Sequence, residues 1–181
     1  MQESKPNAVG APKSWLHNHS SSIVVLGVIL LLIFMQWPFL KGIVYRITGA
    51  GAVDHIAWRT DYVAALDEAR ATGKPLLIDF GASWCPPCQV MKHEVWPDKR
   101  VEQIANERFI PVYIDTDLQQ ERALTFELSS IPTIIATSSA GATLKRGGFM
   151  SASEMVVFMN DALKMHSPAT QSTVEVTTPA P

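Results

Sequence analysis

The sequence predicts an α/β domain, in which helices and strands alternate along the chain, preceded by a single N-terminal transmembrane helix. Three observations support this prediction. Helical and strand patterns alternate between Val53 and His166, residues 23–35 carry no polar side chain, and two cysteines follow the pattern of a buried strand. The 181 residues are enough for one ordinary domain with extensions.

Composition excludes several classes of protein. The 15 Lys and Arg against 17 Asp and Glu give a net charge of −2, so no nucleic-acid partner held by bulk positive charge is expected. The 47% hydrophobic fraction is too high for a wholly disordered chain. The 2 cysteines are too few for a disulfide-stapled mini-domain or a zinc site built only of thiolates, but they can form one disulfide.

The apolar segment at residues 23–40 matches the roughly 17 to 25 helical residues that cross a hydrocarbon core. Trp15 and Trp37 suit the two membrane interfaces. A buried core helix would show a polar face, and a signal peptide would have small residues soon after the apolar run, whereas Ala50-Gly51-Ala52 lies well past Leu40. We therefore expect an uncleaved anchor in contact with the bilayer, whose orientation the flanking lysines and arginines barely specify.

The remaining segments divide the chain further. Residues 1–22 are polar and residues 167–181 are rich in Thr, Pro and Ala, so both predict disordered ends. Residues 41–52, which contain Gly and Ala, predict a linker, and residues 53–166 form the domain.

The domain pattern predicts four strands and four helices. Strands are expected at residues 76–80, 109–114, 133–137 and 143–146. Helices are expected from the caps Thr60 and Asp61 to Ala71, from Pro86 through a bend near Pro97 to Ala105, from Leu118 to Leu128, and from the cap Ser151 to Leu163.

The chemistry centres on the motif Trp84-Cys85-Pro86-Pro87-Cys88, which follows a predicted strand and opens a helix. Free backbone N–H groups and the positive end of the helix dipole favour an anion there, so we expect Cys85 to have a lowered pKa and to be the nucleophile. Cys88 lies one turn away on the same face, at a spacing that permits a disulfide. The two prolines remove N–H donors, so the size of the pKa shift does not follow from the sequence.

The alternative for these cysteines is a zinc site. Cys85 and Cys88 could be joined by His93 and His55. However, His93 would have to turn back to the start of the helix, His55 precedes the first domain helix, and two prolines within a metal-binding turn are unusual. We expect no metal, and interpret His93 as a solvated side chain.

Two motifs resemble the thioredoxin superfamily. Residues 78–88 (IDFGASWCPPC) resemble its active-site corner, and residues 129–137 (SSIPTIIAT) resemble its second signature. The resemblance covers roughly residues 53–166 and implies the thioredoxin-like fold, a central mixed sheet flanked by helices. It also implies a cis peptide bond before Pro132, which would lie against the cysteine pair.

A finer resemblance concerns residues 65–101 and 109–117, which are similar to the thioredoxin-like domains of membrane-linked disulfide reductases. Those proteins export reducing power outside the cytoplasm. The resemblance implies a single-pass membrane protein whose domain lies on the periplasmic face of an inner membrane and receives electrons from a membrane donor.

The resemblance also assigns residues. Asp79 corresponds to the buried acid that helps to move the proton of the resolving cysteine, and a carboxyl on an apolar strand should have a raised pKa. The alternative is a carboxyl that is merely hydrogen-bonded at a strand end. Trp84 corresponds to the aromatic residue flanking the site, or is a packing residue. Gly81 replaces the family's first tryptophan, and the lysine that often pairs with the acid has no clear counterpart in residues 109–115.

The implied reaction is thiol–disulfide exchange, in which Cys85 attacks a protein disulfide and Cys88 resolves the mixed disulfide. The cysteine pair is itself the redox centre, so no dissociable cofactor is expected. The substrate is expected to lie extended against Ile131 and Pro132. The alternatives are a tethered thioredoxin-fold binding protein or chaperone without redox turnover, a disulfide oxidase or isomerase, and an anchored thioredoxin facing the cytoplasm.

Overall fold

The computed structural model of the protein describes residues 15–167, and the chain divides into two compact units, residues 1–37 and 38–181. The ends predicted to be disordered therefore lie largely outside the described residues. The first unit contains α1 (Trp15–Met35), which begins within residues 1–22, where disorder was predicted. Once an apolar helix has formed, each further residue costs little, so it can extend back into polar sequence.

The apolar segment at residues 23–40 does not form the single helix that was predicted. α1 ends at Met35, and α2 (Trp37–Thr48) follows Gln36. Pro38 has no N–H to donate to the carbonyl four residues earlier, so a continuous helix would lack a hydrogen bond here. α2 also takes up most of the predicted linker at residues 41–52.

No single helix among the described residues meets the length and hydropathy criteria for crossing a membrane. The segments 23–35 and 39–48 meet them only when taken together, as a bent pair.

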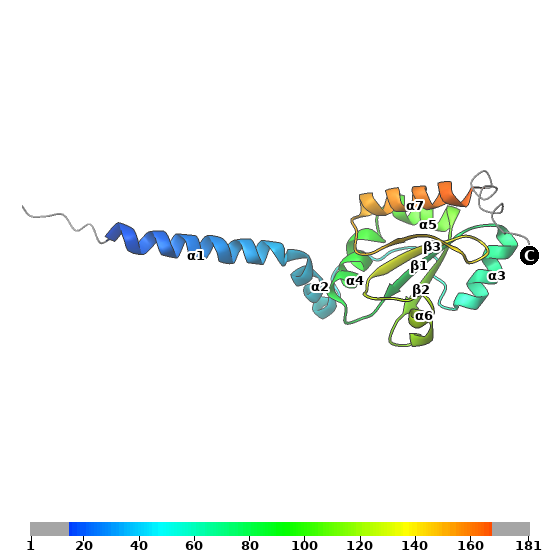
Figure 1. Ribbon diagram of the computed structural model, residues 1–181, viewed down its shortest axis with the longest axis horizontal. Coiled ribbons are helices and arrows are strands. Elements are labelled where there is room, and N and C mark those ends of the chain that lie inside the picture. Colours follow the sequence, from blue (N-terminus) through cyan, green and yellow to red (C-terminus); the bar gives the residue numbers. More distant parts are fainter. Residues whose placement is uncertain (1–14, 168–181) are drawn as a thin grey trace, which may run out of the picture. The chain divides into compact units, whose positions relative to one another are not determined.

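The second unit is built on a mixed four-stranded sheet in the order β2-β1-β3-β4. β1 runs parallel to β2 and antiparallel to β3, and β3 runs antiparallel to β4 (Figure 1). The predicted mixed sheet is thus confirmed, with β1 and β3 in its centre. The strands are β1 (Leu76–Gly81), β2 (Ile110–Asp115), β3 (Thr133–Thr137) and β4 (Thr143–Gly147).

The helices of this unit begin and end largely where the sequence predicts. Asp61 caps the first of them through the N–H groups of Val63 and Ala64, and Ser151 caps the last in a capping box with Glu154. The elements are α3 (Tyr62–Thr72), α4 (Pro86–Val90), the π-helical turn η1 (Met91–Val95), α5 (Lys99–Arg108), α6 (Gln120–Thr125) and α7 (Ala152–His166).

α6 is shorter than the helix predicted from Leu118 to Leu128. At its start, the Asp115 side chain accepts hydrogen bonds from the N–H groups of Asp117 and Leu118, which holds this stretch in a turn. At its end, Glu127 has a positive φ of 50°. The helix therefore stops at Thr125.

Helices cover both faces of the sheet (Figure 1). Leu77 lies in a core cluster with residues of η1, α5 and α7, whereas Leu76 and Ile78 lie in a second cluster with Ala65 and Ala69 of α3. Successive residues of a strand point to opposite faces. Asp79 therefore points to the face that η1, α5 and α7 cover.

Candidate active site

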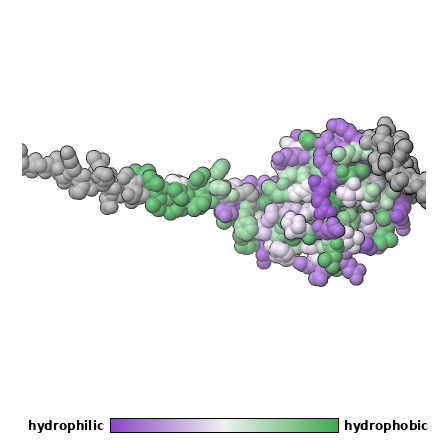
Figure 2. Space-filling view, in the orientation of Figure 1, coloured by the Kyte–Doolittle hydropathy of each residue, from purple (hydrophilic) through white to green (hydrophobic). Residues whose placement is uncertain are grey.

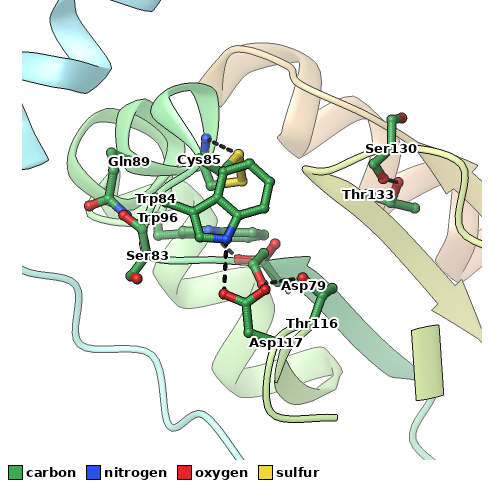
Figure 3. The surroundings of a disulfide bond; sticks show 12 residues. Asp79, Ser83, Trp84, Cys85, Gln89, Trp96, Thr116, Asp117, Ser130 and Thr133 are labelled. Carbon is green, nitrogen blue, oxygen red and sulfur yellow. Dashed lines mark hydrogen bonds between the residues drawn. A yellow bond between two sulfur atoms is a disulfide. The ribbon is translucent and has the colours of Figure 1, made fainter. Parts of the chain in front are cut away.

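The two cysteines form a disulfide at the point where β1 gives way to α4 (Figure 3). The S–S distance is 2.08 Å and the Cα atoms are 5.3 Å apart. In this oxidised form Cys85 is only 2% exposed, whereas Cys88 is partly exposed. The cysteine predicted to attack is thus the more buried of the two.

Cys85 is the N-cap of α4, and its Sγ accepts a hydrogen bond from the Cys88 N–H at 3.3 Å. Pro86 and Pro87 have no N–H, so Cys88 supplies the first amide of the helix that can reach the sulfur. This amide and the start of the helix favour a negative charge on Cys85 once the disulfide is reduced. A lowered Cys85 pKa in the reduced protein stays a prediction.

Asp79 is 7% exposed, and its Oδ2 accepts a hydrogen bond from Trp96 Nε1 at 2.9 Å (Figure 3). The pKa of Asp79 is raised from 3.8 to about 7. Burial is the largest cause, the Trp96 hydrogen bond acts in the opposite direction, and the Asp54 charge adds to the rise. The direction of the shift is the one expected for a desolvated acid, so this carboxyl is able to exchange a proton near neutral pH.

The side chains of Cys88 and Tyr113 both lie close to Gly81, which has no side chain of its own. A Cβ on Gly81 would lie 3.7 Å from Cys88 Cβ and 3.5 Å from the Tyr113 hydroxyl. Asp79 shares a strand face with Gly81, two residues or about 7 Å away, so its carboxyl lies on the same face as Cys88. Tyr113 is also the β2 partner of Asp79. The tyrosine therefore occupies space that a larger residue at position 81 would need.

Tyr113 keeps its proton at physiological pH. Burial raises the pKa of Tyr113 to about 12, and the charges of Asp79, Asp115 and Asp117 act in the same direction. The residue opposite the buried acid is therefore a neutral hydroxyl rather than a cation.

Trp84 is 52% exposed, and its Nε1 donates to Asp117 Oδ2 at 2.9 Å (Figure 3). The hydrogen bond fixes the indole while leaving half of it open to a partner. The peptide bond between Ile131 and Pro132 is cis, as the resemblance implied. Thr133 pairs with Phe80, so extending the register by one residue places Pro132 beside Gly81, at the disulfide end of the sheet.

α2 packs directly on the active-site helix. A Cβ on Gly42 would lie only 2.0 Å from the Pro86 carbonyl oxygen, so the two backbones are in close contact. Lys41 Nζ lies 3.0 Å from Glu94 Oε1, and the Tyr45 hydroxyl donates to the same oxygen at 2.6 Å. Burial raises the pKa of Glu94, but the hydrogen bonds from Tyr45 and Lys41 outweigh it and hold the pKa below its usual range.

His93 is not the solvated side chain that the sequence predicted. Its ring lies against Tyr45, with centroids 4.9 Å apart, and Nδ1 is 3.2 Å from the Ala52 carbonyl oxygen. The predicted linker therefore returns along η1 rather than leaving the domain.

Sequence reasoning did not identify Trp96, Tyr113, Asp117 or the contact between α2 and Pro86. The position of Tyr113 could have been inferred from strand pairing, because neighbouring strands place it opposite Asp79. Trp96 had no such signal, because its direction depends on the π-helical turn.

Comparisons with known proteins agree with this geometry. A family model described as thioredoxin-like matches residues 57–137. The thioredoxin of Mycoplasmoides gallisepticum is 33% identical over 95 residues, which cover 51% of this chain and 88% of that protein.

Solved structures share the fold. A thioredoxin from Thermus thermophilus has a TM-score of 0.57 at 22% identity, covering 68% of this chain and 98% of that one. A putative disulphide-isomerase from Bacteroides thetaiotaomicron has a TM-score of 0.55 at 24% identity, covering 65% of this chain and 100% of that one. These structural matches confirm the predicted thioredoxin-like fold.

The raised pKa predicts how Asp79 affects stability. Because the folded protein holds this proton more tightly than the unfolded chain, the free energy of unfolding falls as pH rises from about 4 to about 7 and then levels off. Asp79→Asn removes this loss, which amounts to at most about 4 kcal/mol above pH 7. Denaturant unfolding of both proteins between pH 4 and pH 8 measures the difference. A difference that does not change with pH would contradict the assignment.

The close approach of Gly42 to Pro86 predicts a second effect. In a Cys88→Ser background, Gly42→Ala must push α2 away from the backbone next to Cys85. We expect reduced Cys85 to be alkylated severalfold faster by iodoacetamide. Gly27→Ala in α1 is the matched control, since nothing lies within 4 Å of its Cβ. Equal rates in the two variants, with cooperative unfolding preserved, would show that α2 does not shield the cysteine.

Proposed function

Because the chain belongs to the thioredoxin superfamily and is a thiol–disulfide oxidoreductase, we propose that it reduces protein disulfides outside the cytoplasm while anchored to a membrane. The observation that carries the redox part of this proposal is the Cys85–Cys88 disulfide at the start of α4. Cys88 lies on the side of the sheet to which the buried acid Asp79 points. The membrane location and the direction of electron flow are the further steps of the proposal.

The reaction is an exchange of disulfide partners. The Cys85 thiolate attacks a substrate disulfide, forming a bond to one substrate sulfur and releasing the other as a thiolate. Cys88 then loses its proton and attacks Cys85, which forms the intramolecular disulfide and releases the second substrate thiolate. The substrate gains two electrons and the cysteine pair loses two.

Protein substrates are the partners that suit the surface around the disulfide. A Cβ on Gly148 would lie 3.6 Å from the Pro132 carbonyl oxygen, so the segment after β4 passes along Pro132. The next residue, Phe149, is 48% exposed, and Trp84 is exposed as well. An extended chain that binds the Ile131–Pro132 backbone would find apolar side chains in this region of the surface. Main-chain recognition of this kind favours broad specificity.

The membrane part of the proposal rests on exposed apolar surface. The described side chains of α1 from Ile23 to Met35 are all exposed and almost all apolar, and Figure 2 shows this segment as a continuous hydrophobic surface. In α2, one edge contacts η1 through Lys41 and Tyr45, while another exposes the apolar side chains of Phe39, Leu40, Val44 and Ile47. An acyl-chain environment is the partner that would cover such surface.

The direction of reaction rests on the resemblance to membrane-linked reductases. A reductase outside the cytoplasm must be re-reduced, so its partner is a membrane protein that supplies two electrons through its own dithiol. The soluble glutathione and thioredoxin pools of the cytoplasm would not reach it.

Substitution of each cysteine distinguishes an enzyme from a binding protein. Cys88→Ser leaves the attacking cysteine without its resolving partner, so mixed disulfides with substrate should accumulate and be visible on non-reducing gels. Cys85→Ser should accumulate far fewer, because the remaining thiol, Cys88, does not occupy the N-cap position that stabilises a thiolate. Both variants should lose turnover with a disulfide-linked peptide. Retention of full biological activity by the double serine variant would instead indicate a binding protein or chaperone.

Labelling of intact cells tests location and direction together. A membrane-impermeant maleimide should label the cysteines of the full chain in spheroplasts without lysis and without added reductant, because a working reductase is kept reduced by its donor. Labelling only after treatment with dithiothreitol would indicate an oxidase. Labelling only after lysis would place the domain in the cytoplasm and contradict the proposal.

A further inference from the structure

The buried acid has a neutral hydrogen-bond donor, in agreement with the absence of a lysine counterpart in residues 109–115. Trp96 Nε1 donates to Asp79 Oδ2 at 2.9 Å, and none of the ion pairs found among residues 15–167 includes Asp79. Opposite it on β2 lies Tyr113. The carboxyl is thus oriented by a donor that carries no charge.

The π-helical turn directs Trp96 towards the acid. The backbone N–H of Trp96 donates to the backbone carbonyl of Met91, five residues earlier, at 3.0 Å. A regular α-helix would donate to the carbonyl four residues earlier, so the wider turn rotates the residues that follow it. The indole of Trp96 is only 2% exposed. Trp96 follows the turn directly as its C-cap residue.

A second tryptophan holds the first. Trp58 packs edge-to-face on Trp96, with ring centroids 5.0 Å apart and an interplanar angle of 82°. Trp58 Nε1 donates to Asp54 Oδ1 at 2.9 Å rather than to Asp79. The two residues therefore share packing but bond to different carboxylates, which makes Trp58 a natural control.

We propose that Trp96 is a positioning residue for thiol–disulfide exchange, whose indole N–H holds the Asp79 carboxylate where it can accept the proton of Cys88. This inference rests on the exchange reaction described above, and not on the membrane location or on the direction of electron flow. In this role Trp96 acts through its hydrogen bond to Asp79 rather than on the sulfur atoms or the substrate.

The step balances without a further reactant. The Cys88 thiol gives its proton to the Asp79 carboxylate, directly or through a water molecule, and becomes a thiolate. The thiolate forms the bond to Cys85, the bond between Cys85 and the substrate sulfur breaks, and the substrate leaves as a thiolate. The proton on Asp79 returns to solvent before the next turnover.

A neutral donor suits this role because a nearby cation would favour the charged carboxylate more strongly and make it a weaker base. The titratable groups that face Asp79 are Tyr113 on β2, Cys88 on α4 and Asp54 before α3. The neighbours from η1, β3 and α7 in this layer are apolar, among them Met91, Ile134 and Met155. Removal of the Trp96 donor should therefore leave desolvation and Asp54 unopposed and raise the pKa of Asp79 further.

The test is the pH profile of a single-turnover reaction. The reduced full chain in detergent is mixed with a fluorogenic disulfide-linked peptide between pH 5.5 and pH 9.5. Trp96→Phe keeps an aromatic ring and removes the indole N–H. The rise of the exchange rate with pH that follows deprotonation of Asp79 should therefore have its midpoint about one pH unit higher. The variant should then be about fivefold slower than the unmodified chain at pH 7 and nearly equal to it at pH 9.

Two further variants separate positioning from packing. Trp58→Phe keeps an aromatic ring against Trp96 and removes an indole N–H that is bonded to Asp54 rather than to Asp79, so it should leave the Asp79-dependent part of the profile in place. In the Asp79→Asn background, Trp96→Phe should cause no additional shift, since the group through which it acts is gone. The inference is overturned if Trp96→Phe lowers the rate equally at all pH values, or if its shift persists without Asp79. No exchange in the unmodified chain would instead contradict the oxidoreductase assignment itself.

A spectroscopic readout avoids any dependence on the folding of Trp96→Phe. In the unmodified full chain, the indole N–H resonance of Trp96 should titrate with a midpoint near the pKa of its acceptor, about 7. In Asp79→Asn the same resonance should be independent of pH over this range. A pH-independent Trp96 resonance in the unmodified chain would show that this N–H does not follow the ionisation of Asp79.

Discussion

A carboxyl group on a strand that is buried on both faces is the constraint on which the active site depends. β1 supplies apolar side chains to both core clusters, and Asp79 interrupts them on the face covered by η1, α5 and α7. Burial of an ionisable group is unfavourable unless it is neutral or hydrogen-bonded. The fold meets this constraint with one indole N–H and leaves the carboxyl with an affinity for protons that is useful at neutral pH. Stability is thus sacrificed at the position where the proposed reaction needs a base.

The active-site helix links this acid to the rest of the molecule. Its first residues carry the disulfide, its π-helical turn directs Trp96 inward, and its outer side accepts α2 through Pro86 and Glu94. A displacement of α2 would therefore act on the backbone beside Cys85.

The domain and the N-terminal segment meet different physical requirements. The domain buries its apolar side chains between sheet and helices, whereas α1 and one edge of α2 leave theirs exposed. Exposed apolar surface of this extent is unfavourable in water. The Gly42 contact shows that α2 nevertheless packs as part of the second unit, and the boundary between the units falls at the first residue of α2 rather than after the helix.

The sequence by itself determined the features that depend on local periodicity and local chemistry. Short, largely apolar runs and a turn signal located all four strands, and the caps at Asp61 and Ser151 located two helix starts. The cysteine spacing predicted a disulfide one helical turn across. The burial of Asp79 followed from the apolar residues on either side of it. Each of these properties is fixed by residues within one or two turns of one another.

Only the tertiary structure decided the features that join distant segments. The hydrogen bond from Trp96 to Asp79 depends on a π-helical turn, and the spacing of apolar residues in the sequence does not predict such a turn. The approach of Gly42 to Pro86 joins residues 44 positions apart in the chain (86 − 42), and it makes a helix of what the sequence predicted to be a linker. Such contacts arise from packing between elements, and the energies of many alternative packings differ too little for one sequence to reveal which is formed.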